Sequence, residues 1–339
     1  GNDYTEYDST TTLNPAAETA YFINSDQDIT IVVDAYSNVT GPNHNLFIDD
    51  ADSLSITIDA GVVFKNEGGA VNSNSYTNVL QNVLPFSIAS LTGTNNLDGT
   101  DVNWELTNTG SNNWDLEVAG GASGQSGQVI HVDNGSLTNI TIENRGVVLS
   151  RENTAIEFDG TTITGTATLT NTNTIRSDST TTDEAAIKIQ DTTGTINITN
   201  NGLIISSTQG ILNTNSIINT IINGSTGILE ATSEGSQADQ YAGLKNAESS
   251  TITTLTNNGL IQANQIFGVG LRNDGTFTQI SNTDQIIGKR GLLNNNTGVI
   301  SNLTNSDTGI ISGSNSMGLR NDGTISWLLN DGIIRSTSS

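Results

Sequence analysis

The stretch GLRNDGTISWLLNDGII, residues 318–334, contains in one piece every part of a repeat that runs through most of the chain. It starts with a Gly-apolar-x-Asn box (residues 318–321), continues to an apolar-x-Asn anchor (328–330) and ends with Gly and two isoleucines (332–334). Three short apolar pieces separated by Gly, Asn and Asp turns are typical of a coil built from three β-strands. A succession of such coils predicts a β-solenoid.

The anchor, Ile or Leu followed by any residue and then Asn, recurs eight times. Its asparagines are Asn144, Asn171, Asn200, Asn223, Asn257, Asn282, Asn305 and Asn330. The asparagines of the box are Asn213, Asn246, Asn273, Asn294 and Asn321. The anchors span 186 residues in seven intervals, which is roughly 27 residues per coil and within the period of solenoids.

This pattern predicts an all-β chain, a right-handed parallel β-helix with about three short strands of roughly three to six residues per coil. Each strand would pair in parallel with its equivalent one coil away, about 4.8 Å along the axis. We expect three parts: a cap with the first coils (1–68), an irregular insertion (69–126) and the regular solenoid (127–339). Strand patterns at 28–34 and 54–64 lie about one coil apart, and residues 1–20 are expected to cover the open end.

Both rows of asparagine are predicted to be structural ladders. A side-chain amide has a donor and an acceptor, so identical Asn residues one coil apart can bond in a continuous row. Asn also tolerates the left-handed backbone that sharp corners require. A ligand-binding amide row is the less favoured interpretation. The twin Arg-Asn-Asp-Gly runs, 272–275 and 320–323, lie close to two coils apart and are interpreted as turns on one edge.

The insertion contains a hairpin pattern. Alternating apolar residues at 102–106 and 114–118 flank a turn-rich connection at 107–113, and Trp104 and Trp114 lie within the two arms. The favoured interpretation is that these residues pack onto the flank of the solenoid. The alternative is a protruding binding element, because Trp is enriched at interface hot spots.

Composition excludes some partners. The net charge is −24, and the chain has no Cys, so its stability would come from ladders and packing rather than disulfides. Residues 1–144 carry one base against 19 acids (−18), and the rest carries ten bases against 16 acids (−6). Nucleic acid and anionic membranes are therefore poor partners. No apolar stretch approaches the roughly 18 residues of a membrane span.

Catalytic and metal patterns are weak. Glycoside hydrolysis needs two carboxylates across a cleft. The candidates are Asp49, Asp50 and Asp52, or Asp183 and Glu184, and both sets lie in stretches that are expected to face solvent. The lone His44 and His131 are expected to be surface or packed residues.

Two acidic turns are the candidates for calcium, which prefers clustered carboxylate and carbonyl oxygens. They contain Asp49, Asp50 and Asp52, and Asp98 and Asp101. Neither matches a known calcium motif, and solvated turns are the favoured interpretation. No other cofactor is predicted.

The repeats of the chain resemble those of a known protein family. The runs TITTLTNNGLI (251–261) and 318–334 are similar to repeats in passenger domains of bacterial autotransporter (type V secreted) proteins, and ITIDAGV (56–62) resembles the start of such passengers. The likeness covers most of the chain outside the insertion. It implies a parallel β-helix displayed on or shed from the outer membrane, often in adhesion or aggregation, and it implies no catalytic residue.

These observations together predict an extracellular structural or adhesive surface protein and not an enzyme. Its expected partners are further copies of itself, stacked head to tail into filaments, or a glycan or protein on a host or neighbouring cell. The alternatives are a polysaccharide-active lyase or glycosidase and a phage tail-type fibre.

Overall fold

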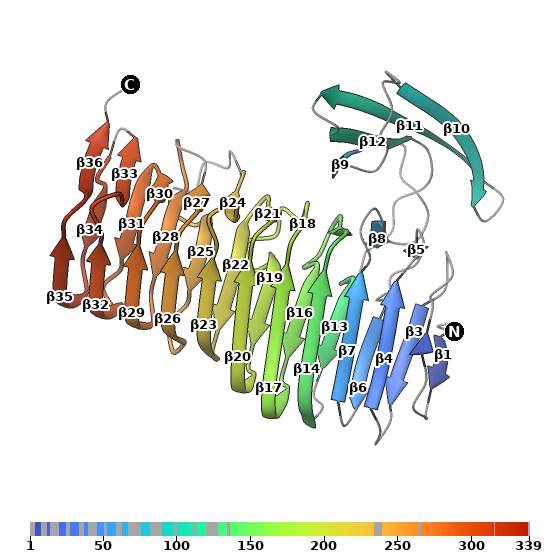
Figure 1. Cartoon of the computed structure of the whole chain (residues 1–339), viewed down its shortest axis with the longest axis horizontal. Coiled ribbons are helices and arrows are strands. Elements are labelled where there is room, and N and C mark those ends of the chain that lie inside the picture. Colours follow the sequence, from blue (N-terminus) through green and yellow to red (C-terminus); the bar gives the residue numbers. More distant parts are fainter. Residues whose placement is uncertain are drawn as a thin grey trace.

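The computed structural model is a β-solenoid of stacked coils (Figure 1). It describes residues 128–133, 136–233, 239–263, 266–314 and 316–337, and in the first 127 residues the backbone of strands β1–β12. Over the described residues, each coil after the first contributes one strand to each of three parallel sheets, which we call A, B and C in the order in which the chain visits them, and the first coil contributes to A and B. A fourth, antiparallel sheet belongs to the insertion.

Sheet A has 11 strands. They are β1 (Tyr4–Tyr7), β3 (Ala20–Asn24), β6 (Leu46–Asp50), β13 (Ile130–Asp133), β16 (Ile156–Asp159), β19 (Ala185–Gln190), β22 (Gln209–Thr214), β25 (Ala242–Asn246), β28 (Val269–Asn273), β31 (Arg290–Asn294) and β34 (Leu319–Asn321).

Sheet B also has 11 strands. They are β2 (Thr12–Leu13), β4 (Asp28–Val33), β7 (Ser53–Ile58), β14 (Ser136–Asn144), β17 (Thr162–Asn171), β20 (Thr193–Asn200), β23 (Ile217–Asn223), β26 (Thr251–Asn257), β29 (Thr276–Asn282), β32 (Val299–Asn305) and β35 (Thr324–Asn330).

Sheet C has ten strands. They are β5 (Ser37–Val39), β8 (Val63–Asn66), β15 (Val147–Ser150), β18 (Thr174–Ser177), β21 (Leu203–Ser206), β24 (Ile228–Ala231), β27 (Leu260–Ala263), β30 (Gln285–Gly288), β33 (Ile310–Ser314) and β36 (Ile333–Thr337).

The predicted fold class is confirmed: three parallel sheets, with coils about 26 residues long. The right-handed sense stays a prediction. Strand length differs from the expectation, because the sheet B strands from β14 onward run for seven to ten residues rather than three to six. Most of their outward positions are polar, although Ile217 and Ile222 on β23 are exposed, and backbone pairing continues through them regardless of the side chain.

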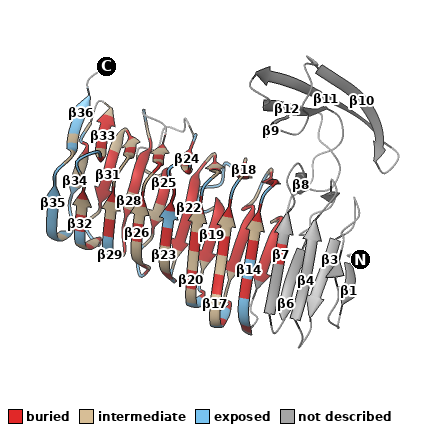
Figure 2. Cartoon of the chain, viewed as in Figure 1, coloured by how far each residue is buried: buried red, intermediate tan, exposed pale blue. Residues whose placement is uncertain are grey.

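The core lies between the three sheets. One apolar residue per coil stacks on its equivalent above and below, and all members of the best-defined column are buried. This column comprises Ile56, Ile142, Leu169, Ile198, Ile221, Leu255, Ile280 and Leu303. Figure 2 shows buried residues along the described coils and exposed ones over the last coil, where Trp327 is 51% exposed.

The asparagines of the repeat are hydrogen-bonded ladders. Each anchor Nδ2 donates to the Oδ1 of the next anchor, from Asn144 to Asn330, over 2.7–2.9 Å. The box asparagines do the same from Asn213 to Asn321, over 2.7–3.0 Å. None of them has a positive φ, so the expected left-handed role was wrong; Asn215, two residues after Asn213, is left-handed instead (φ 47°).

The glycine of each box lies against backbone. A Cβ at Gly210, Gly243, Gly270, Gly291 or Gly318 would lie 2.4–2.7 Å from a carbonyl oxygen. Real Cβ atoms essentially never approach so closely. The absent side chain therefore lets sheets A and C meet closely.

The first coils follow the same plan. Strand β4 pairs with β7 in parallel, with Asp28 opposite Ser53. Strands β1 and β2 add one strand each to sheets A and B. Part of the segment that was expected to cover the end is thus itself a coil.

The solenoid continues across the insertion, because β13, β14 and β15 pair directly with β6, β7 and β8. Within the insertion, β9 (Tyr76–Gln81), β10 (Ser90–Leu97), β11 (Thr100–Gly110) and β12 (Asn113–Ala119) form an antiparallel sheet in the order β10-β11-β12-β9. The predicted hairpin is β11–β12. Its turn is shorter than expected, because Thr107 and Asn108 pair within the ladder and Gly110 pairs with Asn113.

Among the described residues there is no helix with the length and apolarity that crossing a membrane requires.

Candidate functional site

Departures from the repeat gather at one corner of the solenoid, between each sheet C strand and the next sheet A strand. From β14 onward, the other two corners take two or four residues each. The C-to-A corner instead holds the connections 151–155, 178–184, 232–241 and 67–129, the last of which contains the insertion. Because loops on a regular scaffold carry binding and catalytic groups, this corner is where a functional site is expected.

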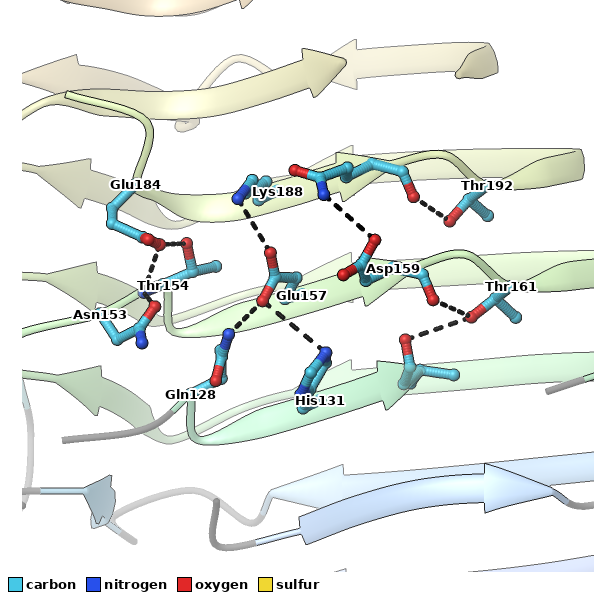
Figure 3. A network of polar contacts seen from close by, with 12 residues as sticks. Gln128, His131, Asn153, Thr154, Glu157, Asp159, Thr161, Glu184, Lys188 and Thr192 are labelled. Atoms are coloured by element: carbon cyan, nitrogen blue, oxygen red, sulfur yellow. Dashed lines mark hydrogen bonds and ion pairs between the residues drawn. The ribbon is translucent and has the colours of Figure 1, made fainter. Parts of the chain in front are cut away.

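A buried ionic network begins where the chain returns from the insertion (Figure 3). His131, Glu157 and Lys188 occupy the same register position on β13, β16 and β19. The Glu157 carboxylate lies 3.0 Å from Lys188 Nζ and 3.8 Å from His131 Nε2, and Gln128 Nε2 donates to it. Glu157 is only 3% exposed. It therefore ties three coils together rather than facing a ligand.

The charge of Lys188 is held by its surroundings. Burial by itself lowers the pKa of a lysine, but the carboxylates of Glu157 and Glu184 outweigh it and raise the pKa of Lys188 above its ordinary value. Lys188 is thus a fixed cation.

Two residues further along the same strands, side-chain hydrogen bonds join the coils. Gln190 Nε2 donates to Asp159 Oδ1 over 3.2 Å. Thr161 Oγ1 donates to the carbonyl oxygens of Val132 and Asp159, and Thr192 Oγ1 to that of Gln190. These bonds, also drawn in Figure 3, secure the A-to-B corner beside the network.

Glu184 was expected to face solvent, and that was wrong. Asp183 is exposed, but Glu184 is partly buried and accepts hydrogen bonds from Thr154 N (3.1 Å) and Thr154 Oγ1 (2.5 Å). The Thr154 loop lies one coil earlier and covers it. Burial raises the pKa of Glu184, and the Thr154 bond and the Lys188 charge offset this only in part.

A hollow of ≈ 550 Å³ opens beside Glu184. Its lining comes from two successive C-to-A loops and is polar throughout: Arg151, Glu152, Asn153, Asp178, Ser179, Thr180, Thr181 and Glu184. Carboxylates, a guanidinium, an amide and hydroxyls can donate and accept hydrogen bonds in several directions. The hollow suits a polar, hydrogen-bonding ligand.

The comparisons give no family. No family model matches the chain, and no curated protein or solved structure is significantly similar to it.

The residues that were predicted for binding and calcium are not among the described residues that line this hollow. Trp104 and Trp114 lie on β11 and β12, opposite Val118 and Asn108, and their side chains are outside the described residues. Asp49 and Asp50 lie on β6 and Asp101 on β11, also without described side chains, and Asp52, Asp98 and His44 are outside the described residues altogether. Within the described part, no three His, Cys, Asp or Glu side chains form a metal-binding group.

The twin Arg-Asn-Asp-Gly runs have matching geometry. Arg272 and Arg320 lie on β28 and β34, two coils apart. Each pairs with the aspartate two residues later, Asp274 at 2.8 Å and Asp322 at 2.7 Å. Both runs end in the turn from sheet A to sheet B, as predicted.

Sequence reasoning missed the contact of Glu157 with Lys188. The signal was present in their equal distance after an apolar residue of the same strand, in IEF and IKI. It was hidden because the early coils lack the asparagine box by which the later coils align.

Proposed function

We propose that this chain is an extracellular structural or adhesive solenoid of the autotransporter-passenger type, which acts by presenting a long surface and not by chemistry. The observation that carries the proposal is the long asparagine ladder, in which seven successive hydrogen bonds join the side-chain amides from Asn144 to Asn330. All its members except the last, Asn330, are buried. Such a continuous ladder stiffens a rod over its described length.

Charge and composition support a place outside the cell. A net charge of −24 favours the solubility of a polar rod and disfavours side-by-side association of its flanks. A chain without Cys needs no oxidative folding step after it is exported. The resemblance of its repeats to passenger domains points the same way.

We extend the proposal to head-to-tail stacking of copies. In this chain, β34, β35 and β36 are the outermost strands of sheets A, B and C, opposite β1, β2 and β5 at the other end. Trp327, Leu328 and Leu329 on β35 are partly exposed. A parallel coil of a second copy would cover these side chains and pair the free strand edges.

Electron microscopy of the purified chain, with calcium and again with a chelator, tests stacking. Filaments of one solenoid's width that grow with concentration support it, and their loss in chelator would assign calcium to the acidic first part. Single short rods at every concentration would rule out stacking.

Adhesion is tested separately with beads coated in the chain. The beads should attach to bacterial or animal cells in greater number than beads coated with an acidic, non-adhesive protein. Equal attachment would contradict an adhesive role.

A polysaccharide-active enzyme is the second candidate, and one observation favours it. Glu184 has a raised pKa and borders the hollow, as a general acid would. This candidate predicts that the chain releases reducing ends from a polysaccharide and that Glu184→Gln abolishes the release. The first proposal predicts no release with either protein.

A further inference from the structure

We propose that the hollow at the C-to-A corner is a binding site for a basic sugar unit, a glycan residue that carries an amine. This inference rests on the proposed adhesive function and names the chemistry of its ligand. It draws on the shape, the rigidity and the charge of the lining.

The walls are held in place before any ligand arrives. Ser177 Oγ donates to Asn153 O over 2.7 Å and joins the two loops. Thr154 bonds to Glu184 by both its backbone N–H and its hydroxyl, which joins them a second time. A site that is already ordered loses little conformational entropy on binding, and this favours affinity.

The later loop is also braced from within. Thr181 N donates to Ser179 Oγ, and Glu184 N donates to Thr181 O over 3.0 Å. These bonds use backbone groups of Thr181, and no hydrogen bond of the Thr180 side chain is found among the described residues. The two threonine side chains are exposed at the rim and can meet a ligand.

The lining selects a sugar rather than an apolar molecule. Drug-like ligands are held by mainly apolar and aromatic walls, whereas every lining residue here is polar. A volume of ≈ 550 Å³ falls within the range of ordinary ligand pockets. Hydroxyls and carboxylates in such a space match the many donors and acceptors of a glycan.

Charge selects an amine over a carboxylate. The lining has three carboxylates, on Glu152, Asp178 and Glu184, against one guanidinium on Arg151. Arg176 Nε neutralises Asp178 at 2.6 Å from outside the lining. Lys188, near Glu184, is already paired with Glu157, so with Glu184 ionised one negative charge remains in excess, which attracts an ammonium group and repels a uronate.

The test measures binding of three oligosaccharide probes by calorimetry: a glucosamine trisaccharide, its N-acetylated form and a galacturonate trisaccharide. The glucosamine probe should bind at least tenfold more tightly than the other two. Thr180→Tyr fills the hollow from its rim and should weaken that binding at least tenfold. Thr182→Tyr is the matched control, because Thr182 is exposed on the same loop and does not line the hollow; it should change binding less than twofold.

Thermal unfolding of both variants checks that the fold is kept. Preference for the galacturonate probe, no binding of any probe, or equal loss in both variants would each overturn the inference. The bead assay keeps the two proposals apart. Adhering beads with no probe binding would refute the site and leave the adhesive function standing, and specific probe binding without adhesion would do the reverse.

Discussion

The early and late coils close the same corner of the solenoid in different ways. At the A-to-B corner, the early coils stack Val132, Phe158 and Ile189 as an apolar column. From Asn213 onward the same register position is asparagine in every coil. The B-to-C corner uses asparagine in both halves.

Asn213, the first asparagine of the box ladder, shows what a ladder requires. Ile189 precedes Asn213 and offers no donor, so Asn213 Oδ1 is buried without a hydrogen-bond partner. A buried unpaired carbonyl costs about 1–3 kcal/mol. The early corners turn on left-handed residues, Gly160 (φ 61°) and Asp191 (φ 47°), and two later corners also do so, at Asn215 (φ 47°) and Ser249 (φ 65°). A ladder is therefore most stabilising in its middle and least at its first member.

Asn257→Ala should have the largest effect. It removes the hydrogen bond that Asn223 donates and leaves the buried Oδ1 of Asn282 without its donor. The free energy of unfolding should therefore fall by about 4 kcal/mol. Asn213→Ala, at the end of the other ladder, also leaves the buried Oδ1 of Asn246 without its donor, but it breaks one hydrogen bond fewer between side-chain amides and removes an unpaired carbonyl, so it should cost about half as much.

Denaturant unfolding and amide exchange measure both changes. Asn302→Ala is the control, because Asn302 is exposed on the outer face of β32, and it should cost less than about 0.5 kcal/mol. Equal losses for Asn257→Ala and Asn213→Ala would contradict the difference between the middle and the end of a ladder.

Lys188→Met tests the ion pair with Glu157 in the early coils, which lack the ladder of box asparagines. It leaves buried Glu157 without its nearest cation, so stability should fall by about 3 kcal/mol near neutral pH. The raised pKa of Lys188 means that its contribution is full below the ordinary lysine pKa and is lost as pH rises through the folded pKa. The gap between wild type and variant should therefore narrow in strong alkali, as followed by denaturant unfolding against pH. A gap that widens there would contradict the ion-pair account.

Gly243→Ala tests the close contact that accompanies the box asparagines. The new Cβ would lie 2.7 Å from Gln262 O and 2.9 Å from Leu229 O, so repacking should cost about 2 kcal/mol. In the early coils Ala186 takes the place of the box glycine, because Ala185 and Ile187 on either side of it pair with the two neighbours of Gly210. A methyl group is therefore accommodated at this position in the early coils. Ala186→Gly should cost about 0.5–1 kcal/mol, mainly from backbone entropy. Thermal unfolding of the pair measures the difference, and a harmless Gly243→Ala would refute the contact.

The sequence predicts the asparagine ladders better than it predicts the contacts of the early coils. The ladders were predictable because one residue type recurs at one register position, and hydrogen bonding between identical amides needs no other information. The network of Glu157 and Lys188 was not, because the early corner is held by unlike apolar residues and the coil length varies, with ladder partners 21 to 34 residues apart. Glu184 was misjudged because TTTDEAA looks like an exposed turn, and only the preceding coil buries it.

Lys245→Met should have the smallest effect and the opposite sign to Lys188→Met. Lys245 lies on β25 in the column of Lys188, two coils later. Burial lowers its pKa, Arg272 lowers it further, and Asp274 and Asp183 compensate only in part. Because the charged form is disfavoured in the fold, the variant should be more stable near neutral pH, by less than about 1 kcal/mol.

The pH dependence gives the sharper test. Between the folded pKa of Lys245 and the ordinary lysine value of about 10.4, the unfolded chain holds a proton that the folded chain has released. Wild-type stability should therefore rise with pH in this window, and the rise should be smaller in Lys245→Met, as measured by denaturant unfolding at stepped pH. A variant that loses stability at neutral pH would mean that Lys245, like Lys188, is held by a favourable pair, and the contrast between the two halves would then rest on the ladders alone.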